Sequence, residues 1–298
     1  MHVKNLVESR AKLGGRWDKM LTQGKIIAHQ ILGDPQYKIR KLVLETDIAE
    51  RALPGQFVHI QVAKGLDPLL RRPFSIADMD PKAGTITLLY RIKGKGTEIL
   101  AQALVGETLS VMGPLGTGFT IPEEGELILV AGGIGSFPLL PLAKAAQEKK
   151  IPCKFYWGGE NIGFFNSAGL ELWEKREIPV FLSSLDGSAG VKGNALDLLN
   201  EELLGEKALG RDFQGQALKG YSAALCGPQG MLKSVCHVLL DAGADVEVSL
   251  EERMGCAIGA CLGCVCTLQD ETGKVYRGKV CTDGPVFKGK EVLWDYEG

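Results

Sequence analysis

Four cysteines near the C-terminus constrain the fold of this chain more than any other feature. Cys256, Cys261 and Cys264 have the spacing C-x4-C-x2-C, and Cys281 follows after sixteen further residues. Plant-type [2Fe–2S] clusters use this ligand spacing. Glycines separate the first three cysteines, as suits a loop whose backbone N–H groups turn toward negatively charged sulfurs. The spacing therefore predicts a small cluster-binding module that carries single electrons.

Two other uses of these cysteines stay open on the residue types alone, a structural zinc site and the disulfides of a secreted domain. Zinc sites usually combine two short pairs of ligands, whereas here three cysteines share one loop and the fourth stands alone. That asymmetry favours the cluster. Cys266 is a fifth candidate, but only Val265 separates it from Cys264, and we assign it to packing.

Composition excludes several classes of function. The 298 residues are 45% hydrophobic and 23% charged, which is ordinary for two or three globular domains. A formal net charge of −2 gives no basic field for nucleic acid. No apolar run reaches about 18 residues, and the charged start lacks the apolar segment of a signal peptide. We expect a cytoplasmic protein with no membrane partner, because thiols stay reduced there.

Changes in sequence pattern divide the chain into parts. Alternating apolar residues at 57–62 and 85–90, each after a Pro or Gly turn, predict a small antiparallel β-barrel. Continuous apolar runs such as 127–130 alternate with helical stretches such as 231–240, which predicts a doubly wound parallel sheet. The expected parts are an N-terminal extension (1–20), a barrel domain (21–120), an α/β domain (121–246) and the cluster module (247–298).

A glycine-rich turn follows the first predicted parallel strand. Gly132, Gly133 and Gly135 stand between the apolar run 127–130 and a helical stretch, so a phosphate can approach the backbone at a helix N-terminus. Pro138 follows, and the common G-x-G-x-x-G fingerprint is absent. The turn alone leaves nucleotide binding and a structural role both open.

A second motif lies in the predicted barrel, where Arg71, Arg72, Pro73, Phe74 and Ser75 combine guanidinium groups, an aromatic ring and a hydroxyl. This run resembles the R-x-[FY]-S flavin motif of the ferredoxin-NADP reductase superfamily. The resemblance implies FAD contacts at Arg72, Pro73, Phe74, Ser75, Leu89, Tyr90, Arg91, Gly96 and Thr97. It also implies that Gly113–Gly116 closes the flavin domain. It places NAD(H) at Gly132, Gly133, Gly135, Cys226, Gly227 and Pro228.

Within that superfamily, the chain from about residue 22 onward resembles the electron-transfer subunits of NAD-dependent dihydroorotate dehydrogenase B. The resemblance rests on Glu252–Cys256 with the cysteine loop, Asp186–Gly190, and Val280–Phe287 around the last cysteine. It implies that Cys256, Cys261, Cys264 and Cys281 bind a [2Fe–2S] cluster and that electrons pass between NADH, FAD and this cluster. It also implies an FMN-containing catalytic subunit as partner, two copies of each subunit, and a role in pyrimidine (UMP) biosynthesis.

Two rival functions are weighed against this one. The small subunit of an NADPH–ferredoxin transhydrogenase or sulfide dehydrogenase is disfavoured, because that paralogue usually has Asp in place of one cysteine. A non-enzymatic metal-binding regulatory module is disfavoured by the flavin and nucleotide motifs. No side chain is assigned as a general acid or base. Cys226 is expected near the nicotinamide, although a small buried residue at a strand end fits the sequence equally well.

The segment after the second parallel strand predicts which nucleotide is used. The adenosine ribose is expected near Trp157–Gly163, where an NADP site normally supplies Arg or Lys. No Lys or Arg lies between Phe155 and Phe165, and Glu160 would repel a 2′-phosphate. We therefore expect NADH to be preferred, with Lys154 as the one cation near enough in sequence to interfere.

Overall fold

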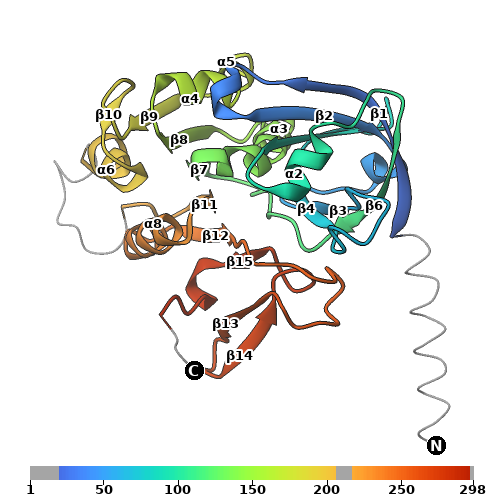
Figure 1. Ribbon diagram of the computed structural model, residues 1–298. Helices are drawn as coiled ribbons and strands as arrows, with labels where there is room; N and C mark the ends of the chain where they lie inside the picture. The colour runs from blue at the N-terminus through green and yellow to red at the C-terminus, as the bar shows by residue number, and fades with distance from the viewer. Residues whose placement is uncertain (1–19, 206–216, 296–298) are drawn as a thin grey trace, which may run out of the picture.

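The computed structural model describes residues 20–205 and 217–295 (Figure 1). A β-barrel and an α/β domain lie side by side, and a smaller module lies below both (Figure 1). The predicted fold class is therefore confirmed in its barrel and its parallel sheet. The predicted N-terminal extension, apart from Met20, lies outside the described residues.

Six antiparallel strands close the barrel in the order β1-β2-β5-β4-β3-β6. Their apolar side chains alternate along each strand, so that Val58 and Ile60 of β3 lie in the barrel core while Phe57 packs outward. One short helix, α2 (Lys95–Leu100), follows β5. The strands are β1 (Leu21–Ile31), β2 (Ile39–Glu45), β3 (Phe57–Ile60), β4 (Arg72–Asp80), β5 (Thr85–Arg91) and β6 (Thr108–Leu115), with 3-10 turns at Pro35–Tyr37 and Asp47–Glu50.

The α/β domain is built on a sheet of order β10-β9-β8-β7-β11-β12-β15, parallel from β10 to β12. Along β7, Leu127 and Leu129 pack in one core and Ile128 and Val130 in the other, because successive side chains point to opposite faces. Helices cover both faces, as doubly wound sheets require. The strands are β7 (Glu126–Gly132), β8 (Cys153–Gly159), β9 (Val180–Ser184), β10 (Val191–Lys192), β11 (Tyr221–Cys226) and β12 (Asp245–Ser249).

Two cores separate the helices by face. Helix α3 (Leu140–Glu148), α4 (Ile162–Ser167) and α5 (Leu170–Glu174) contribute to the core on one face. Helix α6 (Ala195–Leu199), a π-helical turn at Asn200–Leu204 and α8 (Gln229–Asp241) follow on the other face. The sheet order reverses between β7 and β11, and a crevice for ligands is expected at the carboxyl ends of these two strands.

The glycine turn differs from its prediction in one respect. Gly133–Leu139 forms a 3-10 helix that contains Pro138, and helix α3 begins only at Leu140. The expectation that the turn lies at the N-terminus of an α-helix is therefore wrong. Proline lacks the N–H that an α-helical interior needs, so the 3-10 turn extends the connection past Pro138.

The C-terminal module is joined to the α/β sheet rather than tethered beside it. Its hairpin, β13 (Val265–Gln269) and β14 (Val275–Lys279), stands alone, but β15 (Val286–Lys288) pairs antiparallel with β12. A 3-10 turn at Gly289–Glu291 follows. The predicted boundary at 246/247 falls inside β12. The domain boundaries stay predictions.

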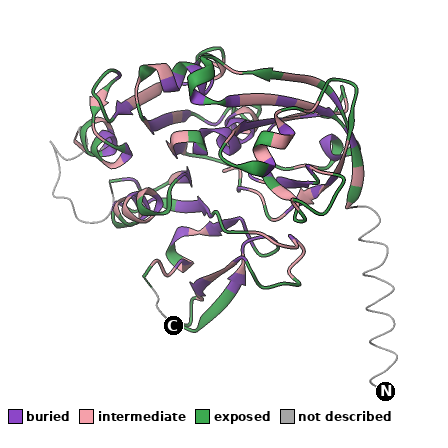
Figure 2. Cartoon of the chain, viewed as in Figure 1, coloured by how far each residue is buried: buried purple, intermediate pink, exposed green. Residues whose placement is uncertain are grey.

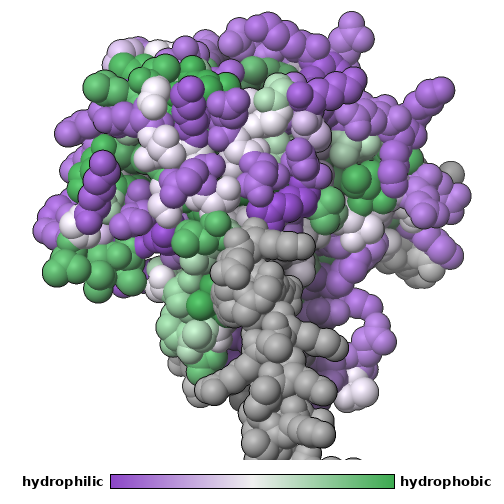
Figure 3. Space-filling model, turned by 90° about the vertical axis from the view of Figure 1, so that its right-hand side faces the viewer, coloured by the Kyte–Doolittle hydropathy of each residue, from purple (hydrophilic) through white to green (hydrophobic). Residues whose placement is uncertain are grey.

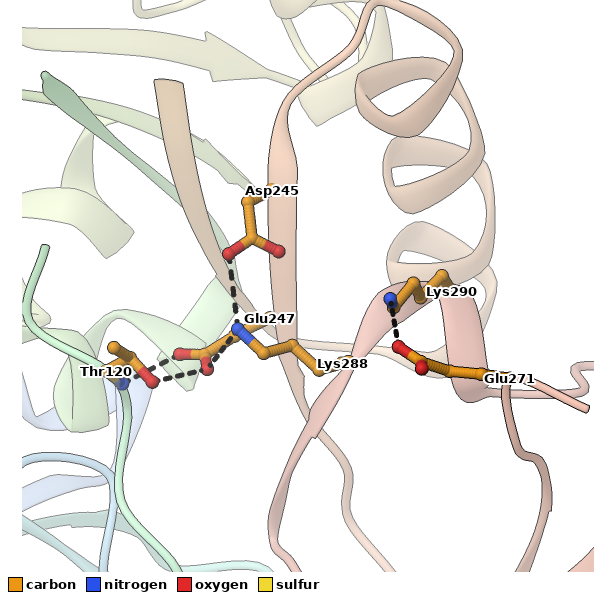
Figure 4. A network of polar contacts seen from close by, with 6 residues as sticks. All are labelled: Thr120, Asp245, Glu247, Glu271, Lys288 and Lys290. Atoms are coloured by element: carbon orange, nitrogen blue, oxygen red, sulfur yellow. Dashed lines mark hydrogen bonds and ion pairs between the residues drawn. The ribbon is translucent and has the colours of Figure 1, made fainter. Parts of the chain in front are cut away.

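A polar cluster holds the three parts together at this junction (Figure 4). The buried carboxylate of Glu247 accepts hydrogen bonds from Thr120 N and Thr120 Oγ1, both at 2.8 Å, and lies 3.1 Å from Lys288 Nζ. Lys288 also pairs with Asp245 at 3.2 Å. The Glu247 carboxylate of strand β12 therefore contacts both the segment that leaves the barrel, through Thr120, and strand β15, through Lys288.

Buried residues run through the sheet, the barrel and the upper part of the C-terminal module, while exposed residues cover the outer loops (Figure 2). The barrel side of the molecule shows hydrophilic groups interspersed with smaller hydrophobic areas where it is visible (Figure 3). Among the described residues, the structure has no helix long and apolar enough to span a membrane.

Candidate redox site

A cavity of about 200 Å³ lies where the barrel, the sheet and the C-terminal module meet. It brings the flavin motif and the predicted nicotinamide motif to one space, next to the linker that leads into the cysteine loop. We call this space the redox cavity. It is lined by Phe57, Pro73, Ser75, Cys226, Ser249, Leu250, Glu251, Glu252, Met254 and Pro285.

The two arginines of the flavin motif have different surroundings. Arg71 donates to Ser110 O and Ser110 Oγ, both at 2.8 Å, so its guanidinium is used within the barrel. Arg72 donates to Leu70 O at 2.6 Å, and its Nε is so close to Gly96 that a Cβ there would approach to 2.6 Å. Arg72 thus lies against the Gly94–Thr97 turn, where a guanidinium and backbone N–H groups can share a phosphate.

The other predicted flavin residues divide between two faces of the barrel. Phe74 and Tyr90 are buried and pack edge to face with ring centroids 5.4 Å apart. The Tyr90 hydroxyl lies 2.8 Å from His29 Nε2. Leu89 packs in the core shared with the α/β domain, and Arg91 forms an ion pair with that domain. Thr97 uses its hydroxyl to accept from Lys93 N at 2.9 Å. Their contacts with FAD stay predictions.

The two nucleotide motifs lie against each other at the switch point of the sheet. A Cβ on Gly135 would approach Cys226 O to 2.2 Å, and one on Gly132 would approach Pro228 Cδ to 2.7 Å. Only glycine permits this contact. Gly133 has φ +57°, and a Cβ there would meet no atom within 4 Å, which leaves open space above the turn. The turn lies at the carboxyl ends of β7 and β11, where doubly wound sheets bind a pyrophosphate, and its contact with NAD(H) stays a prediction.

The thiol of Cys226 stays protonated at neutral pH. It is 2% exposed, and burial followed by the negative charge of Glu251 raises its pKa well above the usual range, although a hydrogen bond with Ser249 opposes the shift. The pKa of the Glu251 carboxyl is raised, because desolvation at the cavity outweighs the opposing positive charge of Lys93. Cys226 thus offers the cavity a small neutral side chain rather than a thiolate.

The cysteine loop turns backbone N–H groups toward its first sulfur. Ala260 N and Cys261 N each lie 3.3 Å from Cys256 Sγ, and Ile258 N lies 3.5 Å away. Burial alone would raise the pKa of the Cys256 thiol, but hydrogen bonds from these N–H groups outweigh it and lower the pKa to about 7. The loop therefore favours the thiolate that an iron–sulfur cluster requires.

The four predicted ligands lie in two pairs. The Cys261 thiol contributes to the lowered pKa of Cys256, and the Cys264 thiol contributes to the raised pKa of Cys281. Burial, and then Cys264, raise the pKa of Cys281 to about 12. Within the described residues, no three His, Cys, Asp or Glu side chains converge to hold a single metal ion. Two pairs of thiols fit a two-iron cluster, in which each iron takes two protein ligands.

The segment around Cys281 fastens the module to the barrel. Thr117 Oγ1 donates to Val286 O at 3.1 Å, and Thr117 N donates to Gly284 O at 2.6 Å. Gly116, with φ +74°, comes so close to Gly284 that a Cβ would approach its carbonyl oxygen to 2.4 Å. The loop that was predicted to close the flavin domain therefore also positions the fourth ligand.

Two cations clarify the nucleotide prediction. Lys154 lies at the amino end of β8 and pairs with Glu126 at 2.9 Å, on the edge of the sheet away from the redox cavity. Arg91, from the barrel, lies 2.7 Å from Glu160. Sequence reasoning missed this contact because the two residues are 69 positions apart.

Cys266, the fifth candidate ligand, lies on β13 and outside the ligand pairs. Burial raises the pKa of its thiol to about 11.

Two family models match the chain in the predicted order. Residues 33–119 match an oxidoreductase FAD-binding domain. Residues 251–293 match the iron–sulfur cluster binding domain of dihydroorotate dehydrogenase B. These matches include the strands of the flavin motif and all four predicted cluster ligands.

Solved structures share the fold. An NADH-dependent reduced ferredoxin-NADP oxidoreductase, studied for flavin-based electron bifurcation, aligns at TM-score 0.75 and 28% identity, covering 91% of this chain and 90% of its own. A ferredoxin NADP⁺ reductase from Neisseria gonorrhoeae with bound FAD and NADP aligns at TM-score 0.60 and 16% identity, covering 78% of this chain and 99% of its own. The second similarity concerns the fold alone.

Curated relatives are more similar in sequence than these structures. The electron transfer subunit of dihydroorotate dehydrogenase B (NAD(+)) from Desulforamulus reducens is 38% identical over 84% of this chain and 90% of its own length. The subunit of the same name from Bacillus mycoides is 40% identical over 86% of this chain and 93% of its own length. The chain belongs to the family of electron transfer subunits of dihydroorotate dehydrogenase B (NAD(+)).

Proposed function

We propose that this protein passes electrons between NAD(H), FAD and a [2Fe–2S] cluster as the electron-transfer subunit of a dihydroorotate dehydrogenase. One observation carries the proposal: the redox cavity is lined by Ser75 of the flavin motif, Cys226 of the nicotinamide motif, and Met254, two residues before the first cluster ligand. A donor of two electrons and an acceptor of single electrons need a carrier between them, and this cavity lies at their meeting point.

When bound, FAD would supply hydride transfer and one-electron transfer, and the cluster would supply one-electron transfer. The residues of this chain would bind and position these groups. Arg72 and the Gly94–Thr97 turn hold a phosphate of FAD, and Ser75 lies at the cavity end of the same strand. The Gly132–Gly135 turn and Cys226–Pro228 hold the dinucleotide. Phe57, Leu250 and Pro285 supply apolar surface to the same cavity.

The partner completes the proposal. We infer a catalytic subunit that contains FMN and oxidises dihydroorotate to orotate, two copies of each subunit, and a place in pyrimidine biosynthesis. The name shared by the relatives supports the partner, since a subunit for electron transfer needs a second subunit for catalysis. A cytoplasmic location is proposed because the described cysteines are all free thiols, which persist in a reducing compartment.

The transhydrogenase paralogue is the second candidate, and the bifurcating oxidoreductase that shares the fold at 28% identity favours it. Two observations favour the dihydroorotate dehydrogenase subunit over this paralogue. The sequence relatives at 38–40% identity carry the dihydroorotate dehydrogenase name, and this chain has cysteine at all four ligand positions.

Native purification followed by an assay tests the proposal. The protein that co-purifies with this chain is identified, and the complex is assayed for dihydroorotate oxidation coupled to NAD⁺ reduction. Coupled turnover that disappears when the two proteins are separated supports the proposal. A complex that reduces ferredoxin or NADP⁺ but does not oxidise dihydroorotate would overturn the proposal.

A further inference from the structure

A second cavity, of about 320 Å³, lies between the start of helix α8, the segment after β12 and the hairpin β13–β14. We call it the side cavity. Gln229 and Arg277 line it and are exposed residues, so the side cavity opens to solvent.

The side cavity and the redox cavity share one wall. Leu250, Glu251 and Glu252 line both of them. Of these three residues, the two glutamates carry groups that can take up and release a proton. A carboxyl group therefore stands between the space next to the flavin and nicotinamide motifs and a cavity that opens to solvent.

The two glutamates act on different neighbours. After burial, the next cause of the raised pKa of Cys226 is the negative charge of Glu251. The corresponding cause for Cys266, on the hairpin, is the negative charge of Glu252. Glu251 is therefore the carboxyl nearer the nicotinamide motif.

The surroundings of Glu251 suit proton exchange. The residue is exposed where it lines the two cavities, yet desolvation raises the pKa of its carboxyl toward neutral pH. The positive charge of Lys93, in the loop after β5, opposes this shift, and Arg277 faces the side cavity from the hairpin. Proton transfer is most efficient when the pKa of the carrier lies near the working pH.

The proposed electron path must also move protons. A hydride that passes from NADH to the flavin carries two electrons and one proton, whereas the cluster accepts electrons alone. For every two electrons that leave the flavin toward the cluster, one proton must therefore leave the flavin as well. One proton must return when the flow is reversed.

We propose that Glu251 carries this proton between the flavin in the redox cavity and water in the side cavity. The inference rests on the function proposed above. The carboxylate takes up the proton and then releases it to water, for which the side cavity is polar and large enough. Cys226 cannot accept the proton, because its thiol is already protonated at neutral pH. No acid or base could be assigned from the sequence, because only the fold places Glu251 between two cavities.

Stopped-flow spectroscopy of the protein loaded with FAD and cluster tests the inference. The protein is reduced anaerobically with NADH and then mixed with excess ferricyanide, which accepts single electrons. Glu251→Gln should keep the wild-type rate of flavin bleaching by NADH, because the hydride brings its own proton. Reoxidation of the flavin should be at least about tenfold slower, since a positioned acid or base contributes about 100- to 10,000-fold and water replaces part of it.

Two further measurements separate proton transfer from a structural role. In wild-type protein the reoxidation rate should rise with pH through the raised pKa of Glu251, because the carboxylate is the form that accepts the proton. Glu251→Gln should lose this rise, and Glu251→Asp, which keeps a carboxyl group, should recover most of the rate. The added negative charge of reduced flavin favours a protonated carboxyl, so reduced-minus-oxidised infrared spectra should show a carboxyl band that shifts in D₂O and is absent in Glu251→Gln.

Glu171→Gln, which removes a surface pair with Lys175 at 3.2 Å, is the matched control and should change neither rate. Wild-type reoxidation in Glu251→Gln would overturn the inference, and so would slow reoxidation in Glu252→Gln alone. If Glu251→Gln does not retain flavin, the infrared band of the wild-type protein and the rate of Glu251→Asp decide, and absence of the band overturns the inference.

Flavin bleaching by NADH is measured in the wild-type protein first. Failure of that bleaching would count against the proposed function. Normal bleaching combined with unchanged reoxidation in Glu251→Gln would count against this inference alone.

Discussion

The cluster loop and the redox cavity hold their reactive groups in opposite ways. Cys256, Cys261 and Cys264 lie within nine residues, and the backbone of the same loop lowers the pKa of Cys256 to about 7. The cavity gathers residues from Phe57 to Pro285, and burial there raises the pKa of Cys226. Three of the four cluster ligands share a single loop, whereas the cavity forms only once three parts of the chain have packed together.

This difference predicts how each site fails. The cluster needs every one of its ligands, so one substitution should remove it completely. The cavity divides its contacts among many residues, and the loss of any one should weaken binding by a finite factor.

Replacement of Cys281 by Ser should abolish the cluster and leave FAD bound. Cys281 is buried in the C-terminal module, pairs with Cys264 and supplies one of four thiolates, whereas the flavin motif lies in the barrel. Wild-type protein should contain about two irons and two acid-labile sulfides per chain. Iron and sulfide analysis with visible spectra of anaerobically prepared protein checks this, and zinc as the only metal in wild-type protein would refute the cluster.

Cys266→Ser is the matched control. Cys266 lies on β13 and is half-buried, and its thiol is not part of either cysteine pair. The variant should keep the full visible spectrum. Loss of the cluster here would show that the ligand set has been assigned wrongly.

Arg72→Ala should release FAD on dilution. Each hydrogen bond from a guanidinium to a phosphate contributes about 1.5–3 kcal/mol, which corresponds to an affinity loss of about 10- to 150-fold. Flavin content after gel filtration measures the effect. Arg71→Ala is the control, because that guanidinium is occupied by Ser110 and should matter less for flavin. Unchanged flavin content in Arg72→Ala would contradict the barrel assignment.

The same contrast explains how much the sequence could predict. Cys256 and its neighbours could be assigned from spacing alone, since the ligands and the N–H groups that serve them are close in sequence. The strands could be predicted because β7 and β11 are continuous apolar runs before glycine motifs. The contact between Arg91 and Glu160 could not, because tertiary packing brings them together from 69 residues apart. The 3-10 turn at Gly133–Leu139 was missed because Leu- and Ala-rich composition suggested an α-helix up to the glycines.

Glu247→Gln should loosen the junction that forms the cavity. The buried carboxylate accepts two hydrogen bonds from Thr120 and pairs with Lys288, and a neutral amide loses the charge in both contacts. We expect the free energy of unfolding to fall by about 2 kcal/mol, measured by chemical denaturation.

Glu271→Gln provides the comparison, since its carboxylate pairs with Lys290 at 3.1 Å but is 82% exposed (Figure 4). An exposed pair contributes between about 0 and 1 kcal/mol. Equal destabilisation by the two variants would mean that the shared carboxylate does not hold the three parts together.

Nucleotide choice is the smallest effect and depends most on the assembled site. NADH should be preferred over NADPH by at least about tenfold in kcat/KM, which corresponds to about 1.4 kcal/mol of transition-state discrimination. Lys154 is engaged with Glu126 at the amino edge of the sheet. Glu160, in the segment where the adenosine ribose is expected, would repel a 2′-phosphate. Steady-state reduction of a dye acceptor by each nucleotide measures the ratio. Equal or faster turnover with NADPH would mean that Arg91 serves the 2′-phosphate, and it would shift the assignment toward the transhydrogenase paralogue.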